Sequence, residues 1–109
     1  MCKACDYTIH SAQDHFGWDN SLAPAERVAP GSTILFHCHD SSAGQLGPSS
    51  TLPDVVSLDF GKINPVSGPI FVEGAMPGDA IKVTIESFAP QLHGGKGFGW
   101  TANIPGFGL

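Results

Sequence analysis

Glycine and proline recur so often in this chain that long, uninterrupted helices and strands are excluded. Fourteen glycines and nine prolines occur among the 109 residues, whereas an average protein has about 12 % of the two together. Glycine weakens helices and strands, and proline fixes φ and removes a backbone donor. Hydrophobic residues still make up 41 % of the chain, which is enough for a core and argues against disorder. We therefore expect one small domain of short elements joined by many tight turns.

Two segments show the alternation of apolar and polar side chains that is typical of strands. They are Ser32–His39 and Ala80–Phe88, and each follows a Pro-Gly pair suited to the centre of a type II turn. Shorter strands are expected at Val55–Phe60 and Pro69–Val72. No stretch sustains a period of 3.6 residues. The sequence thus predicts an all-β, β-sandwich-like domain with short strands, long Gly/Pro-rich loops and little helix.

The N-terminal segment is polar and has little periodicity. We expect residues 1–14 to form a loosely held arm ahead of a domain that spans residues 15–109. Cys2 and Cys5 form a C-x-x-C pair there, but a single pair without a second one is a weak metal signal. We expect two solvent-facing thiols instead. An odd cysteine count and the absence of an apolar leader sequence point to reduced thiols and to the cytoplasm.

Charge and hydropathy exclude two classes of partner. The formal net charge is −5 and the five basic residues are scattered, so there is no basic stripe to contact nucleic-acid phosphates. The apolar runs are much shorter than the roughly 20 residues needed to span a bilayer. Neither nucleic acid nor a membrane is expected as a partner.

The densest group of chemically active side chains follows the first predicted strand. His37 and His39 are two residues apart, so on a strand both rings would project to one side and could share a metal. Asp40 begins the loop that follows. No third ligand is marked by close spacing, and a strand end with half-exposed histidines is the alternative. The His-Cys-His string also occurs in copper sites, but no His or Met lies between Asp40 and Pro69, so we reject copper.

An ordered series of short strings, spread from residue 15 to residue 109, resembles the acetamidase/formamidase family. Each string is weak by itself, and the specificity comes from their order and spacing. The strings are His15–Ser21, Val28–Thr33, Asp40–Gln45, Leu58–Pro69, Phe71–Ala75, Pro77–Asp79 and Ile104–Leu109.

This resemblance implies hydrolysis of a short linear amide, formamide or acetamide, to the carboxylate and ammonia. It also implies a homo-oligomer and a bound divalent metal, zinc-like or calcium-like. Members of the family are considerably longer, so the chain resembles the N-terminal part of such an enzyme. We expect a missing C-terminal portion or a second chain to complete it.

The resemblance and the histidine spacing together suggest three groups of site residues. The candidates are Glu73, Asp40 and His15 for catalysis, Gln45, Trp18 and Trp100 for substrate binding, and Asp40, His37 and His39 for the metal. In this hypothesis a metal-activated water attacks the amide, and Glu73 serves first as base and then as acid. The alternative is a non-catalytic β-sandwich module that binds a ligand or docks onto a subunit.

Overall fold

The computed structural model describes residues 4–106, and within this range most regular structure is short β-strand. The prediction of an all-β chain with little helix is confirmed. The strands are β1 (Tyr7–Ile9), β2 (Asp14–Phe16), β3 (Glu26–Val28), β4 (Ile34–Phe36), β5 (Pro65–Ser67), β6 (Ile70–Val72), β7 (Leu92–His93) and β8 (Lys96–Gly97). The helical elements are η1 (Ser11–Gln13), α1 (Leu52–Val56) and η2 (Phe60–Lys62).

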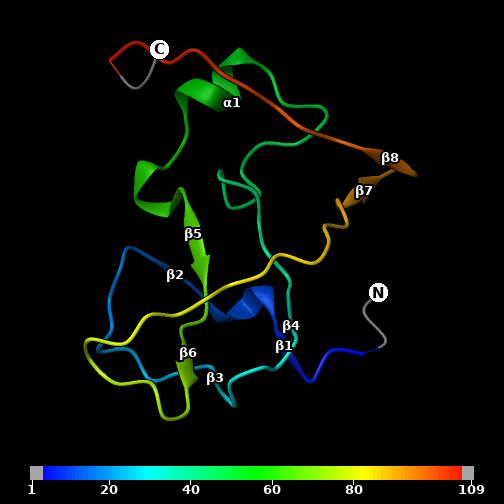
Figure 1. Ribbon diagram of the computed structural model, residues 1–109. Helices are drawn as coiled ribbons and strands as arrows, with labels where there is room; N and C mark the ends of the chain where they lie inside the picture. Colours follow the sequence, from blue (N-terminus) through cyan, green and yellow to red (C-terminus); the bar gives the residue numbers. More distant parts are fainter. Residues whose placement is uncertain (1–3, 107–109) are drawn as a thin grey trace.

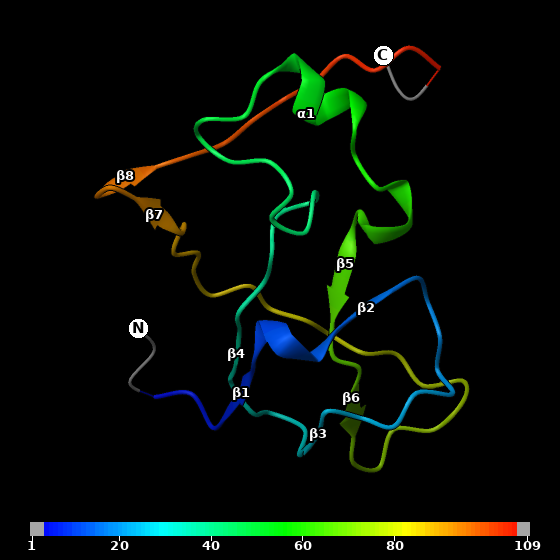
Figure 2. The same ribbon diagram turned by 180° about the vertical axis from the view of Figure 1, so that it is seen from behind.

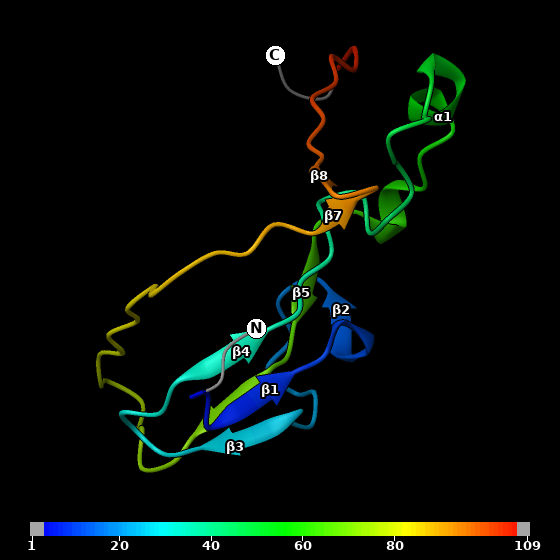
Figure 3. The same cartoon turned by 90° about the vertical axis from the view of Figure 1, so that its right-hand side faces the viewer.

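Three of the four strand pairs join segments that are far apart in the sequence (Figure 1). β1 pairs with β4 and β3 with β6, both in parallel, whereas β2 and β5 are antiparallel. β7 and β8 form a local hairpin. The strands β1, β3 and β4 lie side by side at one end of the molecule, and α1 and its flanking loops lie at the other (Figure 3). Packing of two sheets into a sandwich stays a prediction.

The core of the described residues is small and is divided between the paired strands and the segments that flank α1. Ile9 of β1 is fully buried and Val28 of β3 is 3 % exposed. Leu46 and Leu58, in the segments before and after α1, are also buried. The segment 1–14 that we expect to form an arm thus contains β1, whose Ile9 lies in the core, and the division into an arm and a domain stays a prediction.

The predicted strand Val55–Phe60 is wrong, because this segment consists of the end of α1, an irregular connection and the start of η2. The cause is local capping. The backbone N–H of Thr51 donates to Asp54 Oδ2 at 2.7 Å, and Pro53 lies in the first turn, where a missing N–H costs nothing. Within residues 4–106 no helix is long and apolar enough to cross a bilayer.

The other predicted strands have different outcomes. β6 confirms Pro69–Val72, and β4 covers only the centre of Ser32–His39, since its partner β1 is three residues long. Ala80–Phe88 forms no strand within the described part of the chain. Its residues are exposed, and the segment runs as a yellow arc away from the other elements (Figure 3). Apolar and polar residues do alternate in this segment, but a strand also needs a neighbouring strand to pair with.

The cysteines differ in redox state. Cys5 is disulfide-bonded, so the expectation of a free thiol there is wrong. Cys38 is a free, exposed thiol, as expected. Cys2 lies outside the described residues.

Candidate functional site

Asp40 organises a tight turn after β4. Its carboxylate accepts hydrogen bonds from the hydroxyl of Ser42 at 2.6 Å, the backbone N–H of Gly44 at 2.7 Å and the indole N–H of Trp100 at 2.7 Å. Ser42 itself is fully buried, and its Oγ also accepts from the backbone N–H of Leu46 at 3.0 Å. Asp40 therefore connects its own loop to a segment sixty residues later.

These contacts keep Asp40 ionised. Burial raises the pKa of the Asp40 carboxyl, but the hydrogen bonds from Ser42, Trp100 and Gly44 outweigh burial and lower the pKa below its ordinary value. The donors stabilise the charged form because all of them point N–H or O–H groups at the carboxylate oxygens.

A lowered pKa makes this turn acid-sensitive. The ionised Asp40 contributes stability above the ordinary value of 3.8, and that contribution is lost as the pH falls through the lower folded pKa. We expect Asp40→Asn to lower the urea unfolding midpoint at pH 7. Between pH 7 and pH 3 the midpoint of this variant is expected to fall less than that of the wild type. Asp79→Asn, at an exposed turn, is the control for loss of one charge. Parallel acid profiles for wild type and Asp40→Asn would contradict this expectation.

Gln45 fastens the Asp40 loop to the segment around η2. Its amide oxygen accepts from the backbone N–H of Asp59 at 2.8 Å, and its amide nitrogen donates to the carbonyls of Asp59 and Lys62 at 3.2 and 3.4 Å. Both ends of the side-chain amide thus contact protein backbone. Substrate binding by Gln45 stays a prediction, and the structure shows a positioning contact.

His39, which follows β4, and Asp14, which lies on β2, form a hydrogen-bonded pair. His39 Nδ1 lies 2.8 Å from Asp14 Oδ2, and the hydroxyl of Ser67 donates to Asp14 Oδ1 at 2.9 Å. The side chain of Asp14 is only 9 % exposed, against 44 % for His39. A buried carboxylate bonded to one ring nitrogen fixes the orientation of the imidazole and favours a proton on that nitrogen. Within the described residues, Nε2 makes no hydrogen bond.

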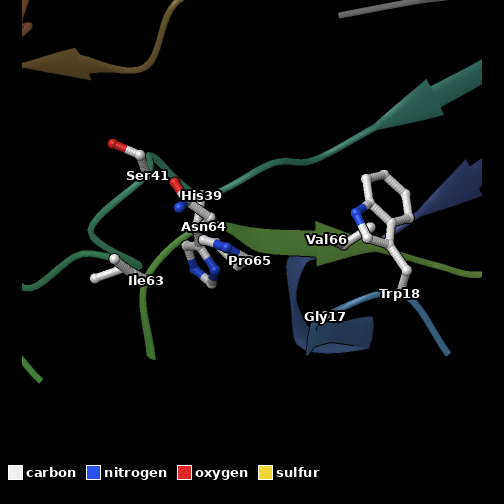
Figure 4. A pocket seen from close by; sticks show the side chains of 8 residues that line it. All are labelled: Gly17, Trp18, His39, Ser41, Ile63, Asn64, Pro65 and Val66. Carbon is white, nitrogen blue, oxygen red and sulfur yellow. The ribbon is translucent and has the colours of Figure 1, made fainter. Parts of the chain in front are cut away.

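The His39 ring lines a pocket of about 480 Å³ together with Trp18, Ser41 and Asn64 (Figure 4). The remaining lining residues are Gly17, Ile63, Pro65 and Val66. The backbone N–H of Asn64 donates to the carbonyl of Ser41 at 2.7 Å, which holds the two loops together. Asn64 has φ +53°, a conformation uncommon outside glycine. Trp18 is 93 % exposed and stands at the pocket's edge (Figure 4).

The predicted metal ligands are not brought together. His37 stacks on His10 with ring centroids 5.5 Å apart, His39 pairs with Asp14, and the Asp40 carboxylate is held by N–H and O–H donors. Among residues 4–106, no three His, Cys, Asp or Glu side chains are grouped to hold a metal ion. The described residues thus do not fit a metal site, and we derive no catalytic step through one.

Glu73 lies apart from the Asp40 turn, and His15 lies on a strand in a different environment. Glu73 is exposed and pairs with Arg27 at 3.4 Å, and the chain after β6 turns at the end opposite to the Asp40 loop (Figure 2). His15 lies on β2 opposite Val66 of the pocket wall. Its Nδ1 is buried without a hydrogen-bond partner. Of the predicted site residues, Asp40 and Trp100 are in direct contact, and Trp18 and His39 share the pocket.

Comparison with known proteins gives these residues a family context. The sequence model of the Acetamidase/Formamidase family matches residues 5–109.

The chain belongs to the acetamidase/formamidase family.

Among curated members, it is 36 % identical over 92 residues to the acetamidase of Mycolicibacterium smegmatis, covering 80 % of this chain and 23 % of that protein. It is 38 % identical over 73 residues to the formamidase of Methylophilus methylotrophus, covering 67 % of this chain and 18 % of that protein. The chain therefore spans less than a quarter of the length of these relatives.

The solved acetamidase of Bacillus halodurans is similar in structure, with a TM-score of 0.59 and 30 % identity. The match covers 66 % of this chain and 24 % of that one.

The family match starts at residue 5, ahead of the strings that carry the resemblance in sequence. It includes β1 and Asp14, which sequence reasoning missed because both lie in a polar segment without periodicity. Ser42 was also missed, although an Asp-x-Ser string is a known signal for a side-chain-capped turn. Asn64 carried only the weak signal of an Asn-Pro pair.

Proposed function

We propose that this member of the acetamidase/formamidase family contributes to the hydrolysis of a short linear amide, formamide or acetamide, at the pocket lined by His39. The observation that supports it best is the His39–Asp14 pair, a base with an orienting carboxylate at the wall of a small pocket. Family membership supplies the reaction class, since curated members are named acetamidase and formamidase.

In this proposal His39 serves as general base. Asp14 holds the proton on Nδ1, so Nε2 carries the lone pair and removes a proton from a water molecule. The water oxygen bonds to the amide carbon, and the carbonyl π-electrons move onto the oxygen. As the C–N bond breaks, the imidazolium returns the proton to the departing nitrogen. The products are the carboxylic acid, which ionises, and ammonia.

Asp40 acts in this proposal by fixing the pocket wall. Its turn sets the path of the chain from His39 through Ser41 to Ser42, and Gln45 and Asn64 tie that loop to the opposite wall. Trp100 is held by the same carboxylate. Substrate binding by Trp18 and Trp100, and a catalytic part for Glu73 and His15, stay predictions.

The divalent metal and the cytoplasmic location also stay predictions from the sequence. A metal would need ligands beyond those that residues 4–106 bring together. Adding a chelator to the activity assay tests whether a metal ion is needed.

Because the relatives are several times longer, the assay uses two proteins. One is the chain itself, and the other is a chimera in which the chain replaces the matching N-terminal part of the M. smegmatis acetamidase. Ammonia release from formamide and acetamide is measured, with the unaltered acetamidase as control. We expect the chimera to release ammonia from at least one amide. A chimera that folds with the circular-dichroism spectrum of the parent but releases none would contradict the proposal.

A further inference from the structure

Asn64 carries a free carboxamide in the pocket that His39 lines. Within residues 4–106 its side chain makes no hydrogen bond, and the residue is exposed. Both its carbonyl oxygen and its NH2 group are therefore open to a ligand. Gln45 differs, because both ends of its side-chain amide contact protein backbone. Among the described residues that line this pocket, Asn64 is the one that offers a carboxamide.

The backbone of Asn64 is held in an uncommon conformation. Asn64 has φ +53°, although it precedes Pro65, and a residue before proline favours an extended backbone with φ near about −120°. Its N–H donates to the carbonyl of Ser41 at 2.7 Å, and Pro65 begins β5, which pairs with β2. Residues outside glycine keep such a φ only where the surrounding structure imposes it, and they are concentrated at ligand sites.

The same contacts fix Asn64 relative to the proposed base. Ser41 lies two residues after His39, so the Asn64–Ser41 hydrogen bond ties Asn64 to the loop of the base. Asp14, which bonds to the His39 ring, lies on β2, the partner strand of β5. In Figure 4 Trp18 lies apart from His39, Ser41 and Asn64. The loop and the strand pair therefore hold the Asn64 amide at the same pocket as the base.

A carboxamide is complementary to an unsubstituted amide. In a planar pair, the NH2 group of each amide donates to the carbonyl oxygen of the other. Formamide offers both partners on one edge, because one of its N–H groups lies on the same side as its oxygen. An N-methyl amide prefers the trans form, in which the methyl group takes that place and one hydrogen bond is lost.

We propose that Asn64 binds the substrate amide and selects primary amides over N-substituted ones. The choice of ligand rests on the proposed amide hydrolysis. Asn64 Nδ2 donates to the substrate carbonyl oxygen, and Oδ1 accepts from the substrate N–H on the same edge. As water bonds to the amide carbon, that oxygen gains negative charge, and the hydrogen bond from Nδ2 stabilises it.

Binding is tested on the chain itself, apart from catalysis. Heteronuclear NMR follows the asparagine side-chain NH2 signals while formamide or N-methylformamide is added, and Asn64→Gly identifies the signal of Asn64. We expect a saturable shift of this signal with formamide. N-methylformamide, with one hydrogen bond fewer, is expected to bind about tenfold more weakly. The exposed Asn103 is the control in the same spectrum.

Catalysis is tested in the chimera. Asn64→Gly removes the carboxamide, keeps the backbone N–H and tolerates the positive φ, and we expect it to lower kcat/KM for formamide about 10²–10³-fold. Asn64→Asp keeps the shape but cannot donate at neutral pH, and a similar loss is expected. Ala43→Gly is the matched control, because Ala43 has φ +54° but does not line the pocket. Its kcat/KM is expected to equal that of the unmutated chimera.

The outcomes separate this inference from the proposed function. An active chimera whose kcat/KM is unchanged by Asn64→Gly would overturn the role of Asn64 and leave His39 as proposed. An inactive chimera, with a saturable shift of the Asn64 signal that formamide causes at about a tenth of the N-methylformamide concentration, would support the amide subsite and contradict hydrolysis. Equal responses of Asn64 and Asn103, or equal affinities for the two amides, would overturn the proposal.

Discussion

Replacing His39 by glutamine in the chimera is expected to lower kcat for amide hydrolysis by about 10²–10⁴-fold, the usual contribution of a general base. Glutamine keeps a polar side chain of similar reach but cannot take up a proton at neutral pH. Because Asp14 and Ser67 remain in place, the pocket wall is expected to hold its shape. Ammonia release at saturating substrate is the measurement, with circular dichroism to check folding.

His37→Gln is the matched control. It removes the same kind of ring two residues earlier, where the imidazole stacks on His10 and does not line the pocket. We expect kcat for this variant to stay within a few-fold of the unmutated chimera. If His39→Gln and His37→Gln behaved alike, His39 would not be the base.

Asp14→Asn tests whether Asp14 acts by orienting the His39 ring. The asparagine keeps the shape of the side chain but removes the charge that holds the His39 proton on Nδ1. We expect a smaller fall in kcat than for His39→Gln, because the base remains but its ring is held less firmly. A kcat equal to that of the unmutated chimera would show that Asp14 does not orient the base.

Truncating Ile9 is expected to have the largest effect on folding. Ile9 is fully buried, and Ile→Ala at such sites costs about 2–5 kcal/mol, from lost burial and the cavity that remains. Few described side chains share the core with Ile9, so this is a large part of the 5–15 kcal/mol typical of small domains. Urea denaturation followed by tryptophan fluorescence measures the change in the free energy of unfolding.

Val56→Ala in α1 is the control for the loss of an aliphatic side chain. Val56 is 77 % exposed, and exposed substitutions of this kind change stability by about 0.5 kcal/mol or less. A loss for Ile9→Ala no larger than that for Val56→Ala would show that β1 is not part of the core.

Much of the family relationship could be predicted from sequence, because it depends on strings of residues and their order. The turn chemistry was also readable. Pro30-Gly31 does form a turn, and Gly31 has φ +83°, the left-handed region that glycine tolerates. The short strand β6 was found because an apolar run between turn residues is a local signal.

The sequence predictions that failed concern elements whose state is decided by contacts elsewhere. Val55–Phe60 alternates over too few residues to outweigh the capping of α1 by Thr51 and Asp54. β1 lies in a polar segment, and only its pairing with β4 places Ile9 in the core. Ala80–Phe88 shows the reverse case, a good strand pattern without a partner in the described chain.

The candidate site divides in the same way. Asp40 stood out in sequence because it follows a strand and lies in a family string. Its links to Trp100 and, through the loop, to Gln45 were not readable, because sixty residues of Gly/Pro-rich chain separate Asp40 from Trp100. Asp14 as the partner of His39 depends on β2 and β4 lying near one another, and no local pattern specifies that.

The abundance of glycine and proline, by itself, determined that this protein has short elements, many turns and little helix, because both residues act on the backbone where they stand. The order of its motifs determined the family. Only the tertiary structure decided which side chains meet: Asp14 with His39, Asp40 with Trp100, and Ile9 with the core. Side-chain contacts between distant segments depend on how loops close and strands pair, and these are properties of the folded chain as a whole.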